Sequence, residues 1–236
     1  TPLDVRVAAL AADQHGVVSA AQLLQRGLTR KAILVRARNG RLHAVHRGVY
    51  AVGHDALTLK GRFMAAVLAG GSGAALGYRS AGAEWECMDW IDDLYLVEVV
   101  IPRSAPLRQP GLRIHRTRRL DPRDVTRHDG IPITTPARTL LDLADILPDK
   151  GLCRAVRQAQ ALNLVSVRQI ADVLTRAQGR RGAARLAQLI ADGPTPTRSV
   201  LEDLVLGVVL DGGFQRPQIN HRKGRVYPDG AGPSSA

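Results

Sequence analysis

Six basic side chains lie close together near the start of the 236-residue chain, in a stretch without a single acidic residue. The cations of this stretch are Arg30, Lys31, Arg36, Arg38, Arg41 and Arg47. Arginine and lysine neutralise phosphates, and arginine also donates paired hydrogen bonds to the edge of a guanine. The stretch is therefore predicted to bind double-stranded DNA, with Val35 and His46 as further contacts. A solvated basic surface without a ligand is the alternative.

The local sequence predicts the elements that position these cations. Apolar residues at helical spacing and the capping residues Ser19 and Thr29 indicate three short helices, over residues 3–12, 20–25 and 30–38. In the second helix Leu23 and Leu24 are expected to face the core, and Gly27 to end it. In the third helix Ile33 and Ala37 are expected inside, with Lys31, Val35 and Arg38 outside.

A hairpin is predicted directly after these helices. Residues 42–45 and 48–52 alternate apolar with polar or small side chains around a His46-Arg47-Gly48 turn, and Gly48 is expected to take a positive φ. Residues 17–18 are expected to form only a short extended link. Three short helices followed by a hairpin are the elements of a winged helix-turn-helix, which is the structure predicted for residues 1–56.

A different pattern, typical of an α+β domain, covers residues 57–192. Helices are predicted over 59–69, 151–162, 167–176 and 182–190, with a further helix beginning at Pro136, and strands are predicted over 94–101, 112–116, 124–127 and 131–134. Thr135 is expected to cap the helix that starts at Pro136. Within that helix Arg138 and Asp142 are four residues apart, so an ion pair between them is expected.

Histidine and carboxylate groups provide two further candidates for chemistry. No set of carboxylate or thiol ligands accompanies His43, His46 and His54, so they are interpreted as ordinary strand and loop residues rather than metal ligands. The most acidic segment holds Glu84, Glu86, Asp89, Asp92 and Asp93. We expect it to be a solvated acidic face or a clamp for the protein's own basic surface, with metal binding as the alternative.

Composition favours a polyanionic partner. The net charge is +12 and the pI is about 10.9, which favours nucleic acid, with an anionic membrane surface as the alternative. Part of this charge is explained by arginine-rich coding in a GC-rich genome, because 29 of the 33 cations are arginines. Cys87 and Cys153 fit neither a zinc site nor a disulfide framework, which favours a cytoplasmic location. We expect no membrane-spanning segment, signal peptide or cofactor.

Several segments of the sequence resemble the AbiEi-type antitoxins of type IV toxin-antitoxin systems. The segments that carry the resemblance are 15–18, 21–24, 27–28, 40–43, 46–53, 78–83, 114–116, 129–143 and 180–182. The resemblance implies that the winged helix binds operator DNA and represses its own operon, and that the partner toxin is a nucleotidyltransferase-like protein. A second basic region, over residues 103–127, is expected either to follow the DNA backbone or to face the toxin.

The last segment, residues 193–236, resembles the opening of a very-short-patch-repair-like endonuclease domain with a PD-(D/E)xK core. Glu202 matches the helix glutamate of that family and Asp229 matches its metal-binding aspartate. A divalent-metal nuclease also needs carboxylates on adjacent strands and a lysine. None follows Asp229 in this sequence, so we expect a truncated remnant without activity.

Taken together, the sequence predicts an α+β protein that is a DNA-binding autorepressor, antitoxin-like and not an enzyme. The alternatives are a metal-dependent endonuclease and an interaction protein that does not bind DNA.

Overall fold

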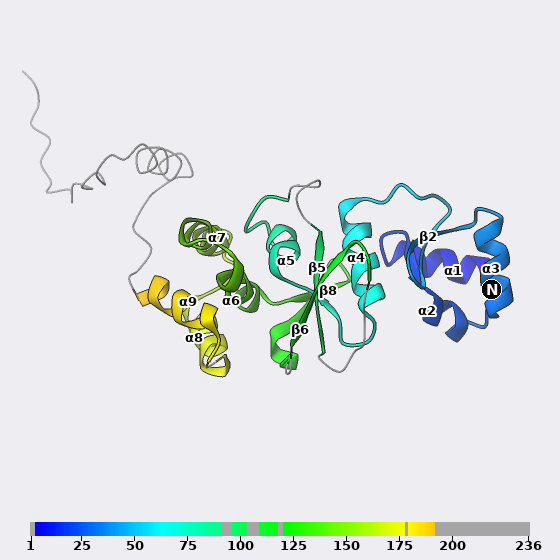
Figure 1. The fold of residues 1–236 in the computed structure, drawn as a ribbon. Coiled ribbons are helices and arrows are strands. Elements are labelled where there is room, and N and C mark those ends of the chain that lie inside the picture. The colour runs from blue at the N-terminus through cyan, green and yellow to red at the C-terminus, as the bar shows by residue number, and fades with distance from the viewer. Residues whose placement is uncertain (1–2, 91–95, 103–108, 118–119, 178, 192–236) are drawn as a thin grey trace, which may run out of the picture. The chain divides into compact units, whose positions relative to one another are not determined.

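The protein is described by a computed structural model over residues 3–90, 96–102, 109–117, 120–177 and 179–191. Its mixed α+β architecture confirms the predicted fold class (Figure 1). The expected endonuclease-like segment 193–236, with Glu202 and Asp229, lies outside the described residues. No helix in the described part has the length and apolar character needed to cross a membrane.

The N-terminal region contains three helices and a three-stranded antiparallel sheet. Its elements are α1 (Leu3–Ala12), β1 (Val17–Ser19), α2 (Ala20–Gln25), α3 (Arg30–Arg38), β2 (Leu42–His46) and β3 (Val49–Val52). The three helices and the hairpin occur where the sequence predicts them. A small core joins the helices to the sheet, and it contains Val7, Ala11, Val18, Leu23, Leu28, Ile33 and Leu42.

Two local expectations for this region are wrong. The segment at Val17 is a strand rather than a link, because it pairs with β3 in the register Val17↔Ala51 and completes a sheet of order β1-β3-β2. Leu24 is 39% exposed instead of facing the core. Consecutive side chains of a helix point about 100° apart, so the buried Leu23 turns its neighbour Leu24 away from the core.

A five-stranded mixed sheet forms the centre of the chain. Its strands and helices are α4 (Leu59–Gly70), β4 (Ala75–Leu76), α5 (Tyr78–Glu84), β5 (Val97–Pro102), β6 (Leu112–Thr117), the 3₁₀ turn η1 (Pro122–Asp124), β7 (Val125–His128) and β8 (Ile131–Thr134). The strand order is β6-β5-β4-β8-β7. The two-residue strand β4 and the helix α5 were not predicted as such. Gly77 follows β4 where a Cβ would lie 2.4 Å from Val100 Cγ2, so a side chain there would force Val100 of β5 to shift.

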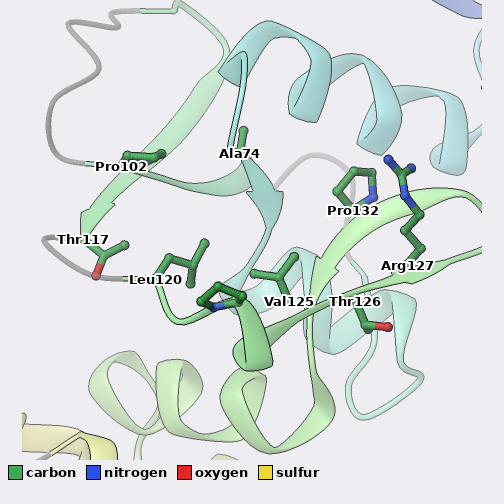
Figure 2. Close-up of a pocket in the computed structure, with 10 residues that line it drawn as sticks. Ala74, Pro102, Thr117, Leu120, Val125, Thr126, Arg127 and Pro132 are labelled. Carbon is green, nitrogen blue, oxygen red and sulfur yellow. The ribbon is translucent and has the colours of Figure 1, made fainter.

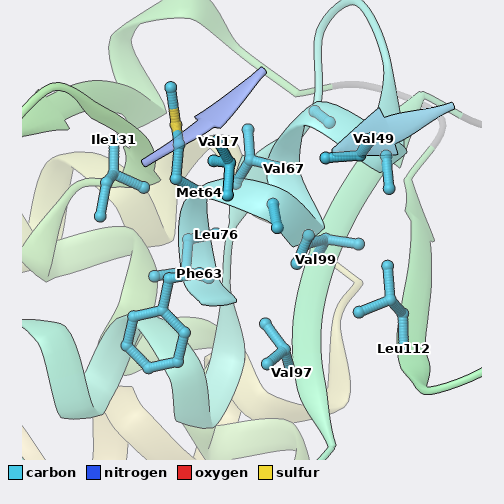
Figure 3. Close-up of a cluster of buried hydrophobic side chains, with 14 of the residues drawn as sticks. Val17, Val49, Phe63, Met64, Val67, Leu76, Val97, Val99, Leu112 and Ile131 are labelled. Carbon is cyan, nitrogen blue, oxygen red and sulfur yellow. The ribbon is translucent and has the colours of Figure 1, made fainter. Parts of the chain in front are cut away.

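Helix α4 packs against both sheets. It contacts β1, β2 and β3 as well as β4, β5 and β8, and Figure 1 shows α5 on the other side of the central sheet. Figure 3 shows the resulting core, in which Phe63, Met64 and Val67 from α4 lie among Val17, Val49 and the strand residues Leu76 and Val99. The N-terminal sheet and the central sheet therefore share one hydrophobic core.

Four helices complete the described residues: α6 (Pro136–Ile146), α7 (Asp149–Ala161), α8 (Val167–Arg176) and α9 (Arg181–Ala191). Helix α6 contacts α5, α7, α8 and α9, so it is the centre of this array. Its apolar stripe faces the core, since Leu140, Leu141, Leu143 and Ala144 are all buried. Thr135 caps α6 as expected by accepting a hydrogen bond from the Arg138 amide.

Candidate nucleic-acid interface

Short-range hydrogen bonds fix the turn between α2 and α3. Ser19 and Gln22 form a reciprocal capping box at the start of α2. At its other end Gly27 has a φ of +96°, a conformation that suits glycine, and it lies one residue beyond the cap Arg26. Leu28 is then buried, and Thr29 Oγ1 accepts a hydrogen bond from the Ala32 amide. The start of α3 is thus fixed by the hydrogen bond of its cap and by the burial of Leu28 in the core.

The outward surface of α3 is defined by five exposed residues on one side of the helix: Arg30, Lys31, Leu34, Val35 and Arg38. Ile33, on the opposite side, is 4% exposed and anchors the helix in the core. Four of these five residues are among the contacts predicted from the sequence, and the fifth is Leu34, which is 56% exposed. The spacing of Leu34 from Arg30 and Arg38, four residues each way, is the signal that identifies it.

Arg36 has a different environment from the other cations of α3. Its Nη2 lies 2.8 Å from Asp4 Oδ1 and its Nη1 donates a 3.4 Å hydrogen bond to the Ala32 carbonyl. The hydrogen bonds and charge of Arg36 hold the pKa of Asp4 below its ordinary value. Asp4 Oδ2 also lies 3.6 Å from Arg41 Nη1. Asp4, outside the acid-free stretch, therefore neutralises part of the charge that the sequence places there.

The β2–β3 hairpin carries the remaining predicted contacts. Arg41 and Arg47 are exposed, and Gly48 has a φ of +77°, as expected for the turn. His46 pairs with Val49 after a register shift between Ala44 and His46. Strand β2 therefore continues to His46, one residue beyond its predicted end at Val45. His46 is half-buried, and burial lowers its pKa, which favours the neutral imidazole.

The outward surface of α3 and the exposed hairpin arginines form the candidate interface. The whole of it lies within the segment that matches a known family. Residues 5–53 match the family of AbiEi antitoxin transcriptional regulators. We refer to this segment as the AbiEi-like region. The match supports the resemblance for these residues.

One solved structure extends the likeness beyond the AbiEi-like region. The crystal structure of the RV2827C protein from Mycobacterium tuberculosis superimposes with a TM-score of 0.52 at 18% sequence identity, over 84% of this chain and 78% of that chain. At this level of identity the likeness concerns the fold. No curated protein sequence matches this chain.

Outside the candidate interface, a cluster of polar side chains joins the AbiEi-like region to the central sheet. His15 Nε2 lies 2.7 Å from the Asp129 carbonyl oxygen, and Lys60 Nζ contacts the carboxylates of Asp129 and Glu84. His128 Nδ1 lies 3.0 Å from Glu84 Oε1. Glu84, His128 and Asp129 have the spacing of a metal-ligand set. However, the Lys60 ammonium contacts both carboxylates and offsets part of their charge, so Glu84 lies against the protein's own cation rather than in open solvent.

The expected pair of Arg138 and Asp142 belongs to a larger buried network. Arg138 Nε lies 2.9 Å from Asp142 Oδ1, which confirms the pair, and Arg138 Nη1 lies 3.0 Å from Asp124 Oδ2. Arg176 Nη2 reaches Asp124 Oδ1 at 2.5 Å, and Arg180 Nη1 reaches Asp142 Oδ1 at 2.9 Å. These pairs tie η1, α6 and α8 to the start of α9. Their arginines are occupied by carboxylates and are not a phosphate site.

One pocket of the described residues lies away from the candidate interface. It has a volume of about 760 Å³ and is lined by residues near the ends of the central strands, including Pro102, Thr117 and Pro132 (Figure 2). Arg127 is the charged side chain among its described lining residues, and it donates a 2.7 Å hydrogen bond to the Gly130 carbonyl. This lining holds no pair of an acid and a base suited to catalysis.

Part of the second basic region can also be placed. Arg123 lies 2.9 Å from Asp121, and Arg113 Nη1 lies 3.7 Å from the buried carboxylate of Glu98. Both arginines are therefore partly neutralised by the protein itself. Residues 103–108 and 118–119 of this region lie outside the described residues, as do Asp92 and Asp93 of the acidic segment.

Proposed function

We propose that this chain is a transcriptional autorepressor that binds double-stranded DNA through the outward surface of α3 and the β2–β3 hairpin. The observation that carries the proposal is the exposed, acid-free surface of α3 within a segment that matches transcriptional regulators. A helix with exposed cations at its start suits the major groove, where its side chains can reach phosphates and base edges.

The predicted contacts divide by their surroundings. Arg30, Lys31, Arg38 and Arg47 are exposed and free to reach phosphates or guanine edges. Arg36 and Arg41 contact the Asp4 carboxylate, so they bind DNA in competition with it. His46 adds a neutral hydrogen-bonding group rather than a charge at pH 7. The exposed cations are therefore the first targets for mutation, ahead of the two arginines that contact Asp4 and of the neutral His46.

We further propose that the chain acts as the antitoxin of a toxin-antitoxin pair and has no enzymatic activity. The match over residues 5–53 to AbiEi antitoxins supports the first part. By the same resemblance, the partner is a nucleotidyltransferase-like toxin.

The DNA-binding proposal is tested by selecting duplexes from a random-sequence library with the full chain and measuring affinity for the recovered sequence and for a scrambled one. The proposal predicts that Lys31→Ala and Arg38→Ala weaken binding to the recovered duplex. Arg154→Ala, which removes an exposed arginine from α7, is the matched control and should leave binding unchanged. Equal affinity for both duplexes, or equal losses in all three variants, would contradict it.

The same preparation tests the two alternatives. If no duplex is recovered but the chain still neutralises a toxin encoded beside it, the protein acts by interaction alone. Incubation with supercoiled plasmid and Mn²⁺ tests the endonuclease alternative, for which the non-enzymatic proposal predicts no nicking. Nicking that is lost in both Glu202→Ala and Asp229→Ala would overturn that proposal.

A further inference from the structure

Two large aliphatic side chains stand exposed in the middle of the outward surface of α3. Leu34 is 56% exposed and Val35 is 44% exposed, although both are residues that usually lie in cores. They are neighbours in sequence on a helix whose inward position is filled by Ile33. Their exposure leaves apolar surface available for a partner.

The charges around this pair indicate what the partner is. Along the helix Leu34 lies between Arg30 and Arg38, and Val35 lies one turn after Lys31. The eight residue-to-residue steps from Arg30 to Arg38 span about 12 Å at a rise of about 1.5 Å each. The major groove is also about 12 Å wide, with phosphates along both edges. A ligand that presents anions on either side of small apolar groups therefore complements this surface.

Within the major groove the apolar group that a base pair offers is the C5-methyl of thymine. We infer that Leu34 and Val35 recognise thymine methyl groups, so that the binding site contains A·T pairs beneath the centre of α3. This inference rests on the proposed DNA-binding function and deepens it, because it assigns sequence selectivity to two residues that carry no charge.

The inference is tested by replacing single thymines of the recovered duplex with deoxyuridine, which removes the methyl group and retains the base-pairing edge. With the wild-type chain we expect a loss of affinity of about fourfold at each contacted thymine, as a buried methylene-sized group contributes ~0.8 kcal/mol. Leu34→Ala and Val35→Ala should each bind the thymine duplex more weakly, and each should lose sensitivity to deoxyuridine at one position.

Leu24→Ala is the matched control, since Leu24 is an exposed leucine of α2 outside the outward surface of α3. It should retain full sensitivity to deoxyuridine. Circular dichroism should show each alanine variant folded, because truncation of an exposed side chain leaves the core unchanged.

The outcomes separate the inference from the function on which it rests. Sequence-selective binding without any effect of deoxyuridine overturns the thymine contact and leaves the proposed function standing. The thymine contact is likewise overturned, and the proposed function left standing, if Leu34→Ala changes the sedimentation coefficient of the chain but not its DNA affinity. Leu34 would then contact a second copy of the chain. Failure to recover any duplex overturns both.

Discussion

Asp4 of α1 and Arg36 of α3 are joined by an ion pair whose Oδ1 and Nη2 atoms lie 2.8 Å apart. The pair fixes the end of the outward surface of α3 relative to the first helix. Because Arg41 also lies 3.6 Å from Asp4, one carboxylate restrains two of the cations predicted to bind DNA. We therefore predict that the DNA affinity of the candidate interface depends on an acidic residue outside it.

Asp4→Asn should increase affinity for the selected duplex, because it removes a negative charge that competes with phosphate for Arg36 and Arg41. We expect an increase of about two- to fivefold at low salt that shrinks above ~0.1 M, where exposed charges are screened over ~10 Å. Fluorescence anisotropy at two salt concentrations measures the effect. Asp55→Asn, which removes an exposed carboxylate after the hairpin, is the control. Unchanged or weaker binding by Asp4→Asn alone would show that Asp4 does not compete.

Arg138→Met should destabilise the fold by about 3 kcal/mol, since it leaves the buried carboxylates of Asp124 and Asp142 short of a partner. The value is at the lower end of the usual range because Arg176 and Arg180 still contact them. Chemical denaturation gives the free energy of unfolding. Asp172→Asn, which removes a 61% exposed partner of Arg176, should cost no more than about 1 kcal/mol. Similar costs for both variants would mean that burial of the network adds nothing.

Gly48→Ala should lower the free energy of unfolding by about 1–2 kcal/mol, because an alanine at a φ of +77° is strained although no atom lies in its way. Gly48→Asn should cost less, since asparagine tolerates this conformation better. Arg47→Ala should instead weaken DNA binding while the melting temperature stays unchanged. Equal thermal losses from Gly48→Ala and Arg47→Ala would contradict this separation of turn and contact.

The stability of the hairpin should fall in mildly acidic solution. Burial keeps the pKa of His46 below its ordinary value of 6.5, so between the two values the unfolded chain binds a proton that the folded chain excludes. Stability is then complete above about pH 6.5 and is lost progressively as the pH falls. Melting temperatures between pH 7.5 and 5.5 should decrease less in His46→Gln than in the wild type. His54→Gln, at an exposed position, should behave like the wild type.

The sequence predicted most elements because their signals are local. Caps at Ser19, Thr29 and Thr135 place three helix starts, and each cap bonds to an amide three residues away. The strand at Val17 was missed because its pairing with Ala51 depends on residues distant in sequence. The two-residue strand β4 is too short to show a period.

Charge compensation was harder to predict than structure. Asp4 and Arg36 are 32 residues apart, and Arg176 and Asp124 are 52 apart, so no spacing rule connects either pair. The i,i+4 rule found Arg138 and Asp142 but gave no sign that both are buried. The candidate interface was therefore predicted as a set of cations, whereas the structure separates the exposed ones from those that contact an acid.

The most direct test of the account is the slope of log Kd against log salt concentration for the selected duplex. We predict that Arg30→Ala, Lys31→Ala and Arg38→Ala each reduce the slope by about 1 where the side chain contacts a phosphate, or cost about 1–3 kcal/mol and relax sequence preference where it contacts a base. Arg168→Ala, at an exposed position of α8, should reproduce the wild-type slope and affinity. Wild-type slope, affinity and sequence preference in all three α3 variants would contradict the claim that this helix binds DNA.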